Sequence, residues 1–373
     1  MKLLHIVTTL DVGGAEMHLL AQVRGQCARG HSVRLAYLKG HGTLVEDFRR
    51  AGAQDVVAIG SGPLALWRLR PHLRWADLVH THLLKADVLG AVAATLWGRR
   101  GVLVSGKHND EQVLKRPLVS LAHGFFGRLP RRTIVLSDHV GRFIAHYGRV
   151  PQSAQRRIYY GLDPEPFERA SEMDANARRA VRAELGIGPD EVVFTCVARF
   201  APQKAHDVLL RAFAQALNTR KDLRLLLVGD DPFGAGRQRA EAVARDLGVH
   251  GQAIFCGIRR DVPRLLGASD VFAMASLWEG LGLVFLEAMA CGLPVLSTRV
   301  SAVPEVVLDG ETGILVPPAD AGAMAAAMLS LAGDRALRLR LGARGRLRVR
   351  AVFGLDRMVD ETLAAYRDVV AAR

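Results

Sequence analysis

Two glutamates bracket an apolar, glycine-bearing stretch of the sequence, EGLGLVFLE, which runs from Glu279 to Glu287. The run from Leu283 onward favours a helix, and Gly292 is typical of its end, so Glu287 is predicted about one turn inside the helix and Glu279 on the loop before it. Unpaired N–H groups at the start of a helix attract anions. The donors would be the backbone N–H groups of Gly282, Leu283 and Val284. The pattern therefore suits a phosphate whose flanking groups carry hydroxyls.

The alternative for this pair is a solvated loop charge and a surface residue of an amphipathic helix. Glu287 stands among apolar neighbours, with no alternating polar face. These neighbours are Phe285, Leu286, Ala288 and Met289. The pattern favours burial of Glu287, and a buried carboxylate requires partners.

Two cations follow an apolar strand pattern in the segment VARFAPQKAHDVLL, namely Arg199 and Lys204. A guanidinium and an ammonium group together can neutralise a diphosphate, including the charge that builds on it when a bond to it breaks. A pair of surface cations is the alternative. Their expected position at a strand end, like that of the glutamate pair, favours the ligand-binding interpretation.

A glycine pair, Gly13 and Gly14, follows the first strand pattern and precedes a helix expected from Ala15 to Arg29. Glycine backbone can approach a ligand closely at such a turn. The spacing is not GxGxxG, so a dinucleotide fingerprint is absent and a tight turn without a ligand remains an equal alternative.

Three histidines, His80, His82 and His108, follow strand patterns in the segments HTHLLKAD and SGKHND. Histidines at the carboxyl ends of strands in an α/β domain are good site candidates. Zinc is conceivable, but no carboxylate pattern accompanies the histidines. The sequence also has no Asp-x-Asp motif. We therefore expect no metal site and no cofactor.

Short apolar strands alternate with helical patterns in both halves of the chain, which predicts an α/β protein with two parallel sheets wrapped by helices. The strand patterns are LLHIVTT, SVRLAYL, DVVAI, DLVHTH, VLVSG and TIVLS in the first half, and VVFTCVA, LRLLLVG, AIFCG, VFAMA and PVLST in the second. We expect two doubly wound, Rossmann-like domains facing each other across a cleft, residues 1–165 and 166–355. The segment from Gly161 to Asp190 is predicted to be a linker, and a helix over 356–373 to pack back on the first domain.

The length of 373 residues also favours two domains. No apolar run approaches the roughly 18 residues of a membrane span, and the amino end lacks a signal-peptide cleavage pattern. The four cysteines are far apart and are expected to be reduced core residues. They are Cys27, Cys196, Cys256 and Cys291. These features predict a cytoplasmic protein.

The net charge of +13 is concentrated in the first half, where residues 1–165 hold 23 Lys and Arg against 12 Asp and Glu. Basic clusters in this half include Arg128, Arg131 and Arg132, followed by Arg142 and Arg149. Such clusters could attract anionic lipid headgroups or a phosphorylated acceptor, although a solvated arginine-rich surface is an equal alternative. Nucleic acid is disfavoured because no nucleic-acid motif is present and few aromatic residues accompany the cations.

Taken together, these loops resemble the retaining GT-B glycosyltransferases of family 4, over nearly the whole chain. The resemblance rests on GGAE, HTHLLKADVLG, SGKHND, YYGLDPEPF, ARFAPQK, LLLVGDDP, SLWEGLGLVFLEAMACGLPVLST and VPEVVLDGETGILVPP. Three positions depart from the family pattern. Ala198 and Ala205 stand where glycine is common, and Tyr160 stands where asparagine is usual.

The resemblance implies a role for each matching residue. Glu279 would contact hydroxyls of the donor sugar, and Glu287 would hold the ribose of the nucleotide. Arg199 and Lys204, with the N–H groups of Gly282, Leu283 and Val284, would bind the diphosphate. His108 would lie near the transferred sugar, Gly14 beside the donor phosphate, and Asp163 would have a structural role.

The reaction implied is transfer of a sugar from a nucleotide diphosphate, UDP- or GDP-linked, to a hydroxyl with retention of configuration and without a metal. The basic first half favours a glycan or lipid-linked glycan acceptor in cell-surface polysaccharide synthesis, lipopolysaccharide included, with peripheral contact at the inner face of the cytoplasmic membrane. Two alternatives remain. One is a sugar-nucleotide epimerase of the same shape, and the other is a nucleotide-sugar-binding protein without catalysis.

Overall fold

A computed structural model of the protein describes residues 1–231 and 234–372, and the chain forms two compact units. Unit 1 comprises Met1–Gly161 and Phe353–Arg373, and unit 2 comprises Leu162–Val352. The boundaries predicted from the sequence, after residues 165 and 355, lie a few residues from these.

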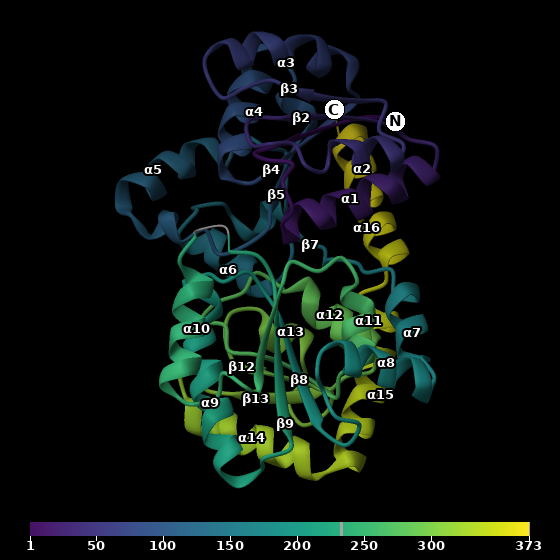
Figure 1. The fold of residues 1–373 in the computed structure, drawn as a ribbon. Coiled ribbons are helices and arrows are strands. Elements are labelled where there is room, and N and C mark those ends of the chain that lie inside the picture. The colour runs from purple at the N-terminus through teal and green to yellow at the C-terminus, as the bar shows by residue number, and fades with distance from the viewer. Residues whose placement is uncertain (232–233, 373) are drawn as a thin grey trace. The chain divides into compact units, whose positions relative to one another are not determined.

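Unit 1 contains a seven-stranded parallel sheet with the order β3-β2-β1-β4-β5-β6-β7 (Figure 1). Its strands are β1 (Lys2–Val7), β2 (Ser32–Tyr37), β3 (Asp55–Ala58), β4 (Leu78–His82), β5 (Leu103–Lys107), β6 (Arg132–Val135) and β7 (Gln155–Arg157). Its helices are α1 (Gly14–Ala28), α2 (Val45–Arg50), α3 (Leu64–Trp75), α4 (Leu84–Leu96), α5 (Pro117–Phe126), α6 (Asp138–His146) and the C-terminal α16 (Leu355–Ala371).

Two apolar cores lie on opposite faces of this sheet, because alternate residues of a strand point to opposite sides. Leu3 and Val7 of β1 pack with α1, α2 and α16, whereas Leu4 and Ile6 pack with α3 and α4. Tyr366 of α16 is fully buried in the first of these cores. The C-terminal helix is therefore part of unit 1.

Unit 2 contains a six-stranded parallel sheet with the order β10-β9-β8-β11-β12-β13. Its strands are β8 (Val192–Val197), β9 (Leu223–Val228), β10 (Ala253–Gly257), β11 (Val271–Met274), β12 (Val295–Thr298) and β13 (Gly313–Val316). Its helices are α7 (Glu165–Ser171), α8 (Ala175–Glu184), α9 (His206–Thr219), α10 (Gly236–Asp246), α11 (Val262–Gly267), α12 (Leu283–Ala290), α13 (Val303–Val306), α14 (Ala321–Gly333) and α15 (Arg335–Val352).

The predicted linker from Gly161 to Asp190 is wrong, because this segment forms α7 and α8 of unit 2. The side chain of Asp174 caps α8 by accepting hydrogen bonds from the N–H groups of Asn176 and Ala177. Helix α7 packs against α11 and α12. All eleven predicted strands are present, but the sequence analysis missed the edge strands β7 and β13.

Each sheet reverses its strand order at one place, between β1 and β4 in unit 1 and between β8 and β11 in unit 2. Ligands of open α/β sheets bind outside the carboxyl ends of the strands at such a switch point. The predicted site loops lie there: those after β1 and β4 in unit 1, and those after β8 and β11 in unit 2. Among the described residues, no helix is both long and apolar enough to cross a membrane.

Candidate active site

The loop after β11 holds Glu279 in a buried polar cluster of unit 2. Lys204 Nζ donates a hydrogen bond to Glu279 Oε1 over 2.5 Å, and Ser276 Oγ donates to the same oxygen over 2.6 Å. The two charged side chains are 13% and 5% exposed, so the ion pair is largely shielded from water. The structure thus joins two residues, 75 positions apart, that the sequence analysis selected separately.

Helix α12 begins directly after Gly282, whose φ of +83° lies in the left-handed region that glycine adopts readily. In the described part of the chain, the N–H groups of Gly282, Leu283 and Val284 donate no hydrogen bond. These donors lie at the positive end of the helix dipole, where an anion is stabilised. The structure confirms the predicted helix start and places Glu279 before it.

Glu287 lies on α12 and is half-buried. Burial raises the pKa of its carboxyl to about 7. Burial alone accounts for this shift, with no contribution from an ion pair or hydrogen bond to a described residue. A carboxylate in this setting is stabilised by hydroxyl groups that donate hydrogen bonds to it.

The loop after β8 carries Arg199 and Lys204 and leads into α9. Arg199 is exposed, so its guanidinium is available to an anionic ligand. Ala205, which starts α9, has a φ of +44°. Glycine adopts this left-handed conformation readily, which explains why it is common at the position. In this chain, Ala205 adopts the same conformation.

The loop after β1 in unit 1 presents Gly13 and Gly14 at the start of α1. Gly14 is exposed, and a Cβ added to it would meet no atom within 4 Å. A Cβ on Gly13 would lie 2.5 Å from the carboxylate of Glu16. A side chain at position 13 would therefore have to displace the end of the Glu16 side chain, whereas at position 14 the space is open.

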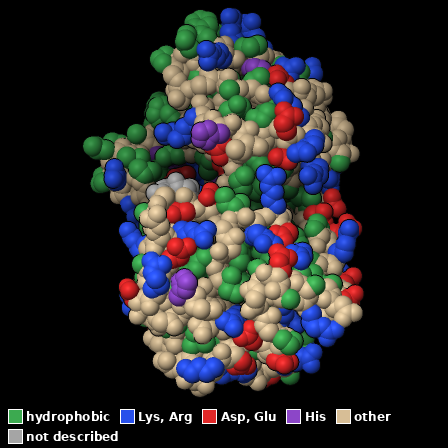
Figure 2. Space-filling view, in the orientation of Figure 1, with side chains coloured by type: hydrophobic (Ala, Val, Ile, Leu, Met, Phe, Trp, Pro, Cys, Tyr) green, Lys and Arg blue, Asp and Glu red, His purple; other side chains and the backbone are tan. Residues whose placement is uncertain are grey.

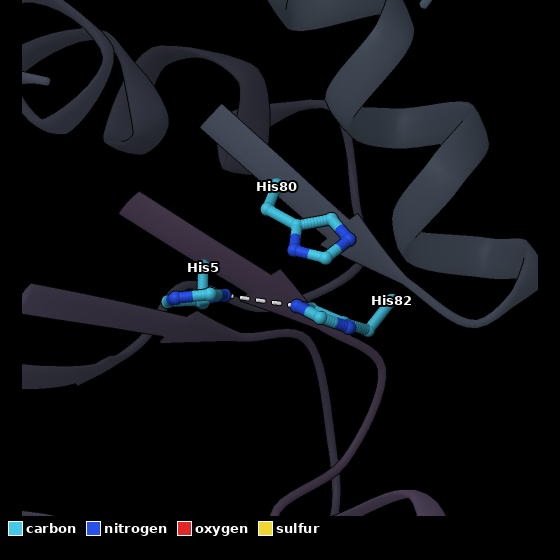
Figure 3. A group of neighbouring side chains, drawn as sticks. All are labelled: His5, His80 and His82. Carbon is cyan, nitrogen blue, oxygen red and sulfur yellow. Dashed lines mark hydrogen bonds between the residues drawn. The ribbon is translucent and has the colours of Figure 1, made fainter. Parts of the chain in front are cut away.

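His80 and His82 of β4 lie beside His5 of β1 on the sheet face covered by α1 and α16 (Figure 3). One ring nitrogen from each histidine lies within 4.8 Å of the other two, a spacing that could admit a metal ion. Most of these nitrogens have partners, however. His5 Nδ1 and His82 Nε2 are 2.9 Å apart, and His80 Nδ1 lies 2.6 Å from the hydroxyl of Tyr366.

His108 follows β5, and both of its ring nitrogens have partners. Nε2 lies 2.9 Å from His82 Nδ1, and Nδ1 lies 2.7 Å from the hydroxyl of Tyr160. Burial lowers the pKa of His108 to about 3, with the charge of Lys107 as a smaller cause. The imidazole is therefore neutral and fixed in orientation at neutral pH.

Sequence reasoning missed several residues that contact this cluster. Tyr160 stacks on His18 with ring centroids 3.8 Å apart, and His5 bonds to Gln26. The signal for His5 was its alternation with Leu3 and Val7, which places it on the same sheet face as His80. No sequence signal identified Tyr160 as a histidine partner.

Two family models together match most of the chain. The model of the family described as Glycosyltransferase Family 4 matches residues 12–166, and that of Glycosyl transferases group 1 matches residues 191–334. The GDP-mannose-dependent alpha-(1-6)-phosphatidylinositol monomannoside mannosyltransferase of Mycolicibacterium smegmatis is 30% identical over 354 residues, covering 90% of this chain and 89% of that protein. The chain belongs to glycosyltransferase family 4.

Another relative of this family 4 glycosyltransferase is the D-inositol 3-phosphate glycosyltransferase of Mycobacterium tuberculosis, 31% identical over 314 residues, which are 79% of this chain and 62% of that protein. Among solved structures, Anabaena HepE in complex with UDP and glucose has a TM-score of 0.88 at 21% identity, covering 98% of this chain and 100% of that one. WaaG, a glycosyltransferase involved in lipopolysaccharide biosynthesis, has a TM-score of 0.74 at 20% identity, covering 98% and 99%.

These structural similarities show that the family 4 glycosyltransferase has the GT-B fold, with two Rossmann-like domains. The protein is an enzyme that transfers a sugar from a nucleotide sugar to an acceptor. The relatives named here support neither the epimerase nor the binding-protein alternative.

Proposed function

We propose that the enzyme transfers a hexose from UDP or GDP, with retention of configuration, to a lipid-linked glycan at the surface of an anionic membrane. The donor would be bound by unit 2 through Glu279, Glu287, Arg199 and Lys204. HepE binds UDP-glucose and the mycobacterial relative uses GDP-mannose, so both nucleotides are candidates.

In the proposed reaction, the bond between the anomeric carbon and the diphosphate oxygen breaks while the acceptor hydroxyl attacks from the same face. The acceptor proton passes to the leaving phosphate oxygen. Arg199, Lys204 and the N–H groups at the start of α12 would stabilise the charge that develops on the diphosphate. His108, neutral and with both ring nitrogens engaged, would not exchange a proton and would limit the position of the sugar through contact with its ring.

The observation that carries the membrane part of the proposal is the exposed apolar face of α5. Leu118, Leu121 and Phe125 are 82%, 59% and 69% exposed. They stand at helical spacing on one face. Figure 2 shows hydrophobic side chains gathered over α5, whose place Figure 1 gives. An exposed group of this kind marks an interaction surface.

Cations flank this apolar face, and no acidic residue interrupts the sequence between Glu111 and Asp138. The cations are Lys115, Arg116, Arg128, Arg131 and Arg132. A helix with an apolar face and cationic flanks lies in the interface of an anionic bilayer, where the apolar side chains enter the headgroup region and the cations meet phosphates. This charge pattern favours a membrane over a protein partner.

The donor is tested by thermal stabilisation and hydrolysis with UDP-, GDP- and ADP-sugars in the presence of EDTA. We expect one nucleotide to stabilise the enzyme and Glu287→Ala to remove the effect. The anomeric proton of the product, observed by NMR, tests retention. A product of inverted configuration, or a donor effect that EDTA abolishes, would contradict the corresponding part of the proposal.

The membrane contact is tested by flotation with vesicles of phosphatidylglycerol and phosphatidylcholine. We expect the double variant Leu121→Asn, Phe125→Asn to lose binding, while Leu64→Asn on α3, which removes a similarly exposed leucine from unit 1, keeps it. High salt should weaken binding of the unmodified enzyme, because screening reduces attraction of the cations to anionic lipid. Equal binding of both variants would exclude α5 as the contact.

A further inference from the structure

A continuous chain of side-chain hydrogen bonds crosses the interior of unit 1 and reaches His108. Gln26 Oε1 lies 2.9 Å from His5 Nε2, and His5 Nδ1 lies 2.9 Å from His82 Nε2. His82 Nδ1 lies 2.9 Å from His108 Nε2, and His108 Nδ1 lies 2.7 Å from the hydroxyl of Tyr160. The chain joins α1, β1, β4, the loop after β5 and the segment after β7, and Figure 3 shows its central bond.

The amide oxygen of Gln26 gives this chain one direction, because it can only accept. His5 must then donate from Nε2, which leaves its Nδ1 to accept from His82 Nε2–H. By the same logic His108 donates from Nε2 to His82 and accepts from the hydroxyl of Tyr160. All three imidazoles therefore carry their proton on Nε2, and the tautomer of His108 is fixed by Gln26, two histidines away.

The surroundings keep the three imidazoles neutral and the phenol of Tyr160 protonated, as this direction of the hydrogen bonds requires. Burial lowers the pKa of His5 to about 4 and that of His108 to about 3, and it lowers the pKa of His82 well below its usual value, with neighbouring imidazoles adding to the effect. Burial, with the charge of Glu16 as a smaller cause, raises the pKa of Tyr160. Three neutral imidazoles and an intact phenol thus persist across the neutral pH range.

We propose that His82, His5, Gln26 and Tyr160 are positioning residues that fix the tautomer and ring orientation of His108 for sugar transfer. The proposal rests on the role proposed above for His108 at the transferred sugar. A ring held at both nitrogens cannot rotate, so its orientation within unit 1 is set before the donor arrives. Reactions of this kind are sensitive to misplacement of about 1 Å.

Tyr160 stands where the family resemblance leads us to expect asparagine. Its phenol ring stacks on His18 at an interplanar angle of 15°, which orients the hydroxyl that His108 accepts from. Tyr160 thus completes the chain at the end where the imidazole meets the site.

A metal ion held by His5, His80 and His82 is the competing explanation of the cluster. It would have to replace the bond between His5 and His82, whereas the hydrogen-bond chain uses all four nitrogens of these two rings in the structure as it stands. The hydrogen bonds therefore favour the positioning role, and metal content becomes an outcome of the test.

The test uses two amide variants at position 82 whose side chains differ in length by one methylene group. In His82→Asn the amide can occupy the place of Nδ1 and still accept from His108, whereas in His82→Gln it reaches the place of Nε2 and bonds only to His5. We expect kcat to fall about ten- to a hundredfold in His82→Gln and clearly less in His82→Asn, with the donor KM changed less than threefold in both. A purely structural role predicts the larger loss in His82→Asn, which leaves the larger cavity.

His80→Gln is the control. His80 lies two residues from His82 on the same strand and is equally buried, but it bonds to Tyr366 and not to a member of the hydrogen-bond chain. We expect its kcat to stay within twofold of the unmodified enzyme. Proton–nitrogen spectra of enzyme labelled at histidine nitrogen provide a readout independent of turnover. The tautomer signal of His108 should change in His82→Gln, Tyr160→Phe and Gln26→Leu, and stay unchanged in His80→Gln.

Three results would overturn the proposal. They are an unchanged His108 signal in the hydrogen-bond variants, a kcat lowered at least as much in His82→Asn as in His82→Gln, or stoichiometric zinc in the purified enzyme that both His80→Gln and His82→Gln lose. If instead the signal changes as expected but turnover does not, the chain orients His108 and the role of His108 at the sugar is wrong. The spectra thus separate failure of the chain from failure of the proposed function.

Discussion

Lys204 and Glu279 form a buried ion pair, with Nζ 2.5 Å from Oε1, although the family pattern assigns them to different parts of the donor. An ammonium group has three donors, so Lys204 can keep Glu279 and still bond to a phosphate oxygen. The same pair fixes the carboxylate, which Ser276 also holds, before any sugar hydroxyl reaches it. One contact therefore links the loop after β8 to the loop after β11.

Lys204→Met should be both less active and less stable, because it removes a cation and leaves Glu279 as an uncompensated buried charge. Loss of one partner of a buried pair costs about 3–5 kcal/mol of unfolding free energy. The double variant Lys204→Met, Glu279→Gln should recover part of this loss but none of the activity. Urea unfolding of the single and double variants measures the coupling, and equal stability of the two would argue against the ion pair.

Nucleotide binding should tighten as the pH rises from 6 to 8, because the pKa of Glu287 is raised to about 7 in the free protein. Ribose hydroxyls donate stronger hydrogen bonds to the ionised carboxyl than to the protonated one, so the ligand favours deprotonation and lowers this pKa. Affinity can change by up to about tenfold per pH unit in this range. Titration calorimetry at pH 7, in two buffers of different ionisation enthalpy, should detect proton release.

Glu287→Gln is the control for this pH effect, since glutamine keeps the shape and cannot titrate. Its affinity should be weaker and nearly independent of pH. The variant should also be more stable than the unmodified enzyme above pH 7, where the raised pKa means that ionising Glu287 costs stability in the free protein. Proton uptake on binding would contradict the assignment of Glu287 to the ribose.

The sequence predicted well where the strands end and the site loops begin, because loops such as that from Ser276 to Gly282 carry strong local signals. It could not predict that Lys204 pairs with Glu279, since that contact depends on β8 and β11 being neighbours in the sheet. The histidine chain was hidden for the same reason. His5 and His82 belong to strands whose pairing is set by the fold, and Tyr160 departs from the family pattern.

The linker prediction failed for a different physical reason. Charged residues and glycines between Gly161 and Asp190 indicated a solvated connection, but Asp174 caps a helix and α7 finds apolar partners on α11 and α12. Tertiary packing decided the structure of a segment whose local composition was ambiguous.

Acid should destabilise unit 1 well above the pH at which its carboxylates titrate. Burial lowers the pKa of His5 to about 4, and that of His80 and His82 well below the usual value, so the unfolded chain binds more protons than the folded one below about pH 6.5. Stability is therefore present above this pH and is lost as the pH falls toward the folded pKa. The expected slope is about 1.4 kcal/mol per pH unit for each histidine.

Denaturant unfolding between pH 7.5 and 4.5 measures this slope. His5→Gln should reduce it by about the contribution of one proton, whereas replacement of the exposed His41 should leave it unchanged. A stability that stays constant down to pH 5 would show that the cluster titrates in the folded protein.

Gly14→Ala should separate a functional glycine from a structural one. A methyl group at this position meets no atom within 4 Å, and alanine is favoured over glycine by up to about 1 kcal/mol inside a helix, so the variant should fold with unchanged or raised melting temperature. The family resemblance implies that Gly14 lies beside the donor phosphate. In that case the methyl group would keep the phosphate from approaching the backbone closely, and kcat/KM should fall by about tenfold or more.

Gly101→Ala is a matched control, because Gly101 is also exposed in unit 1 and has no atom within 4 Å of an added Cβ. Its activity should be unchanged. Steady-state kinetics with the donor found in the nucleotide panel, together with melting curves, measure both variants. Normal turnover in Gly14→Ala would place the donor phosphate away from the start of α1, and a lowered melting temperature would show that the glycine serves the fold.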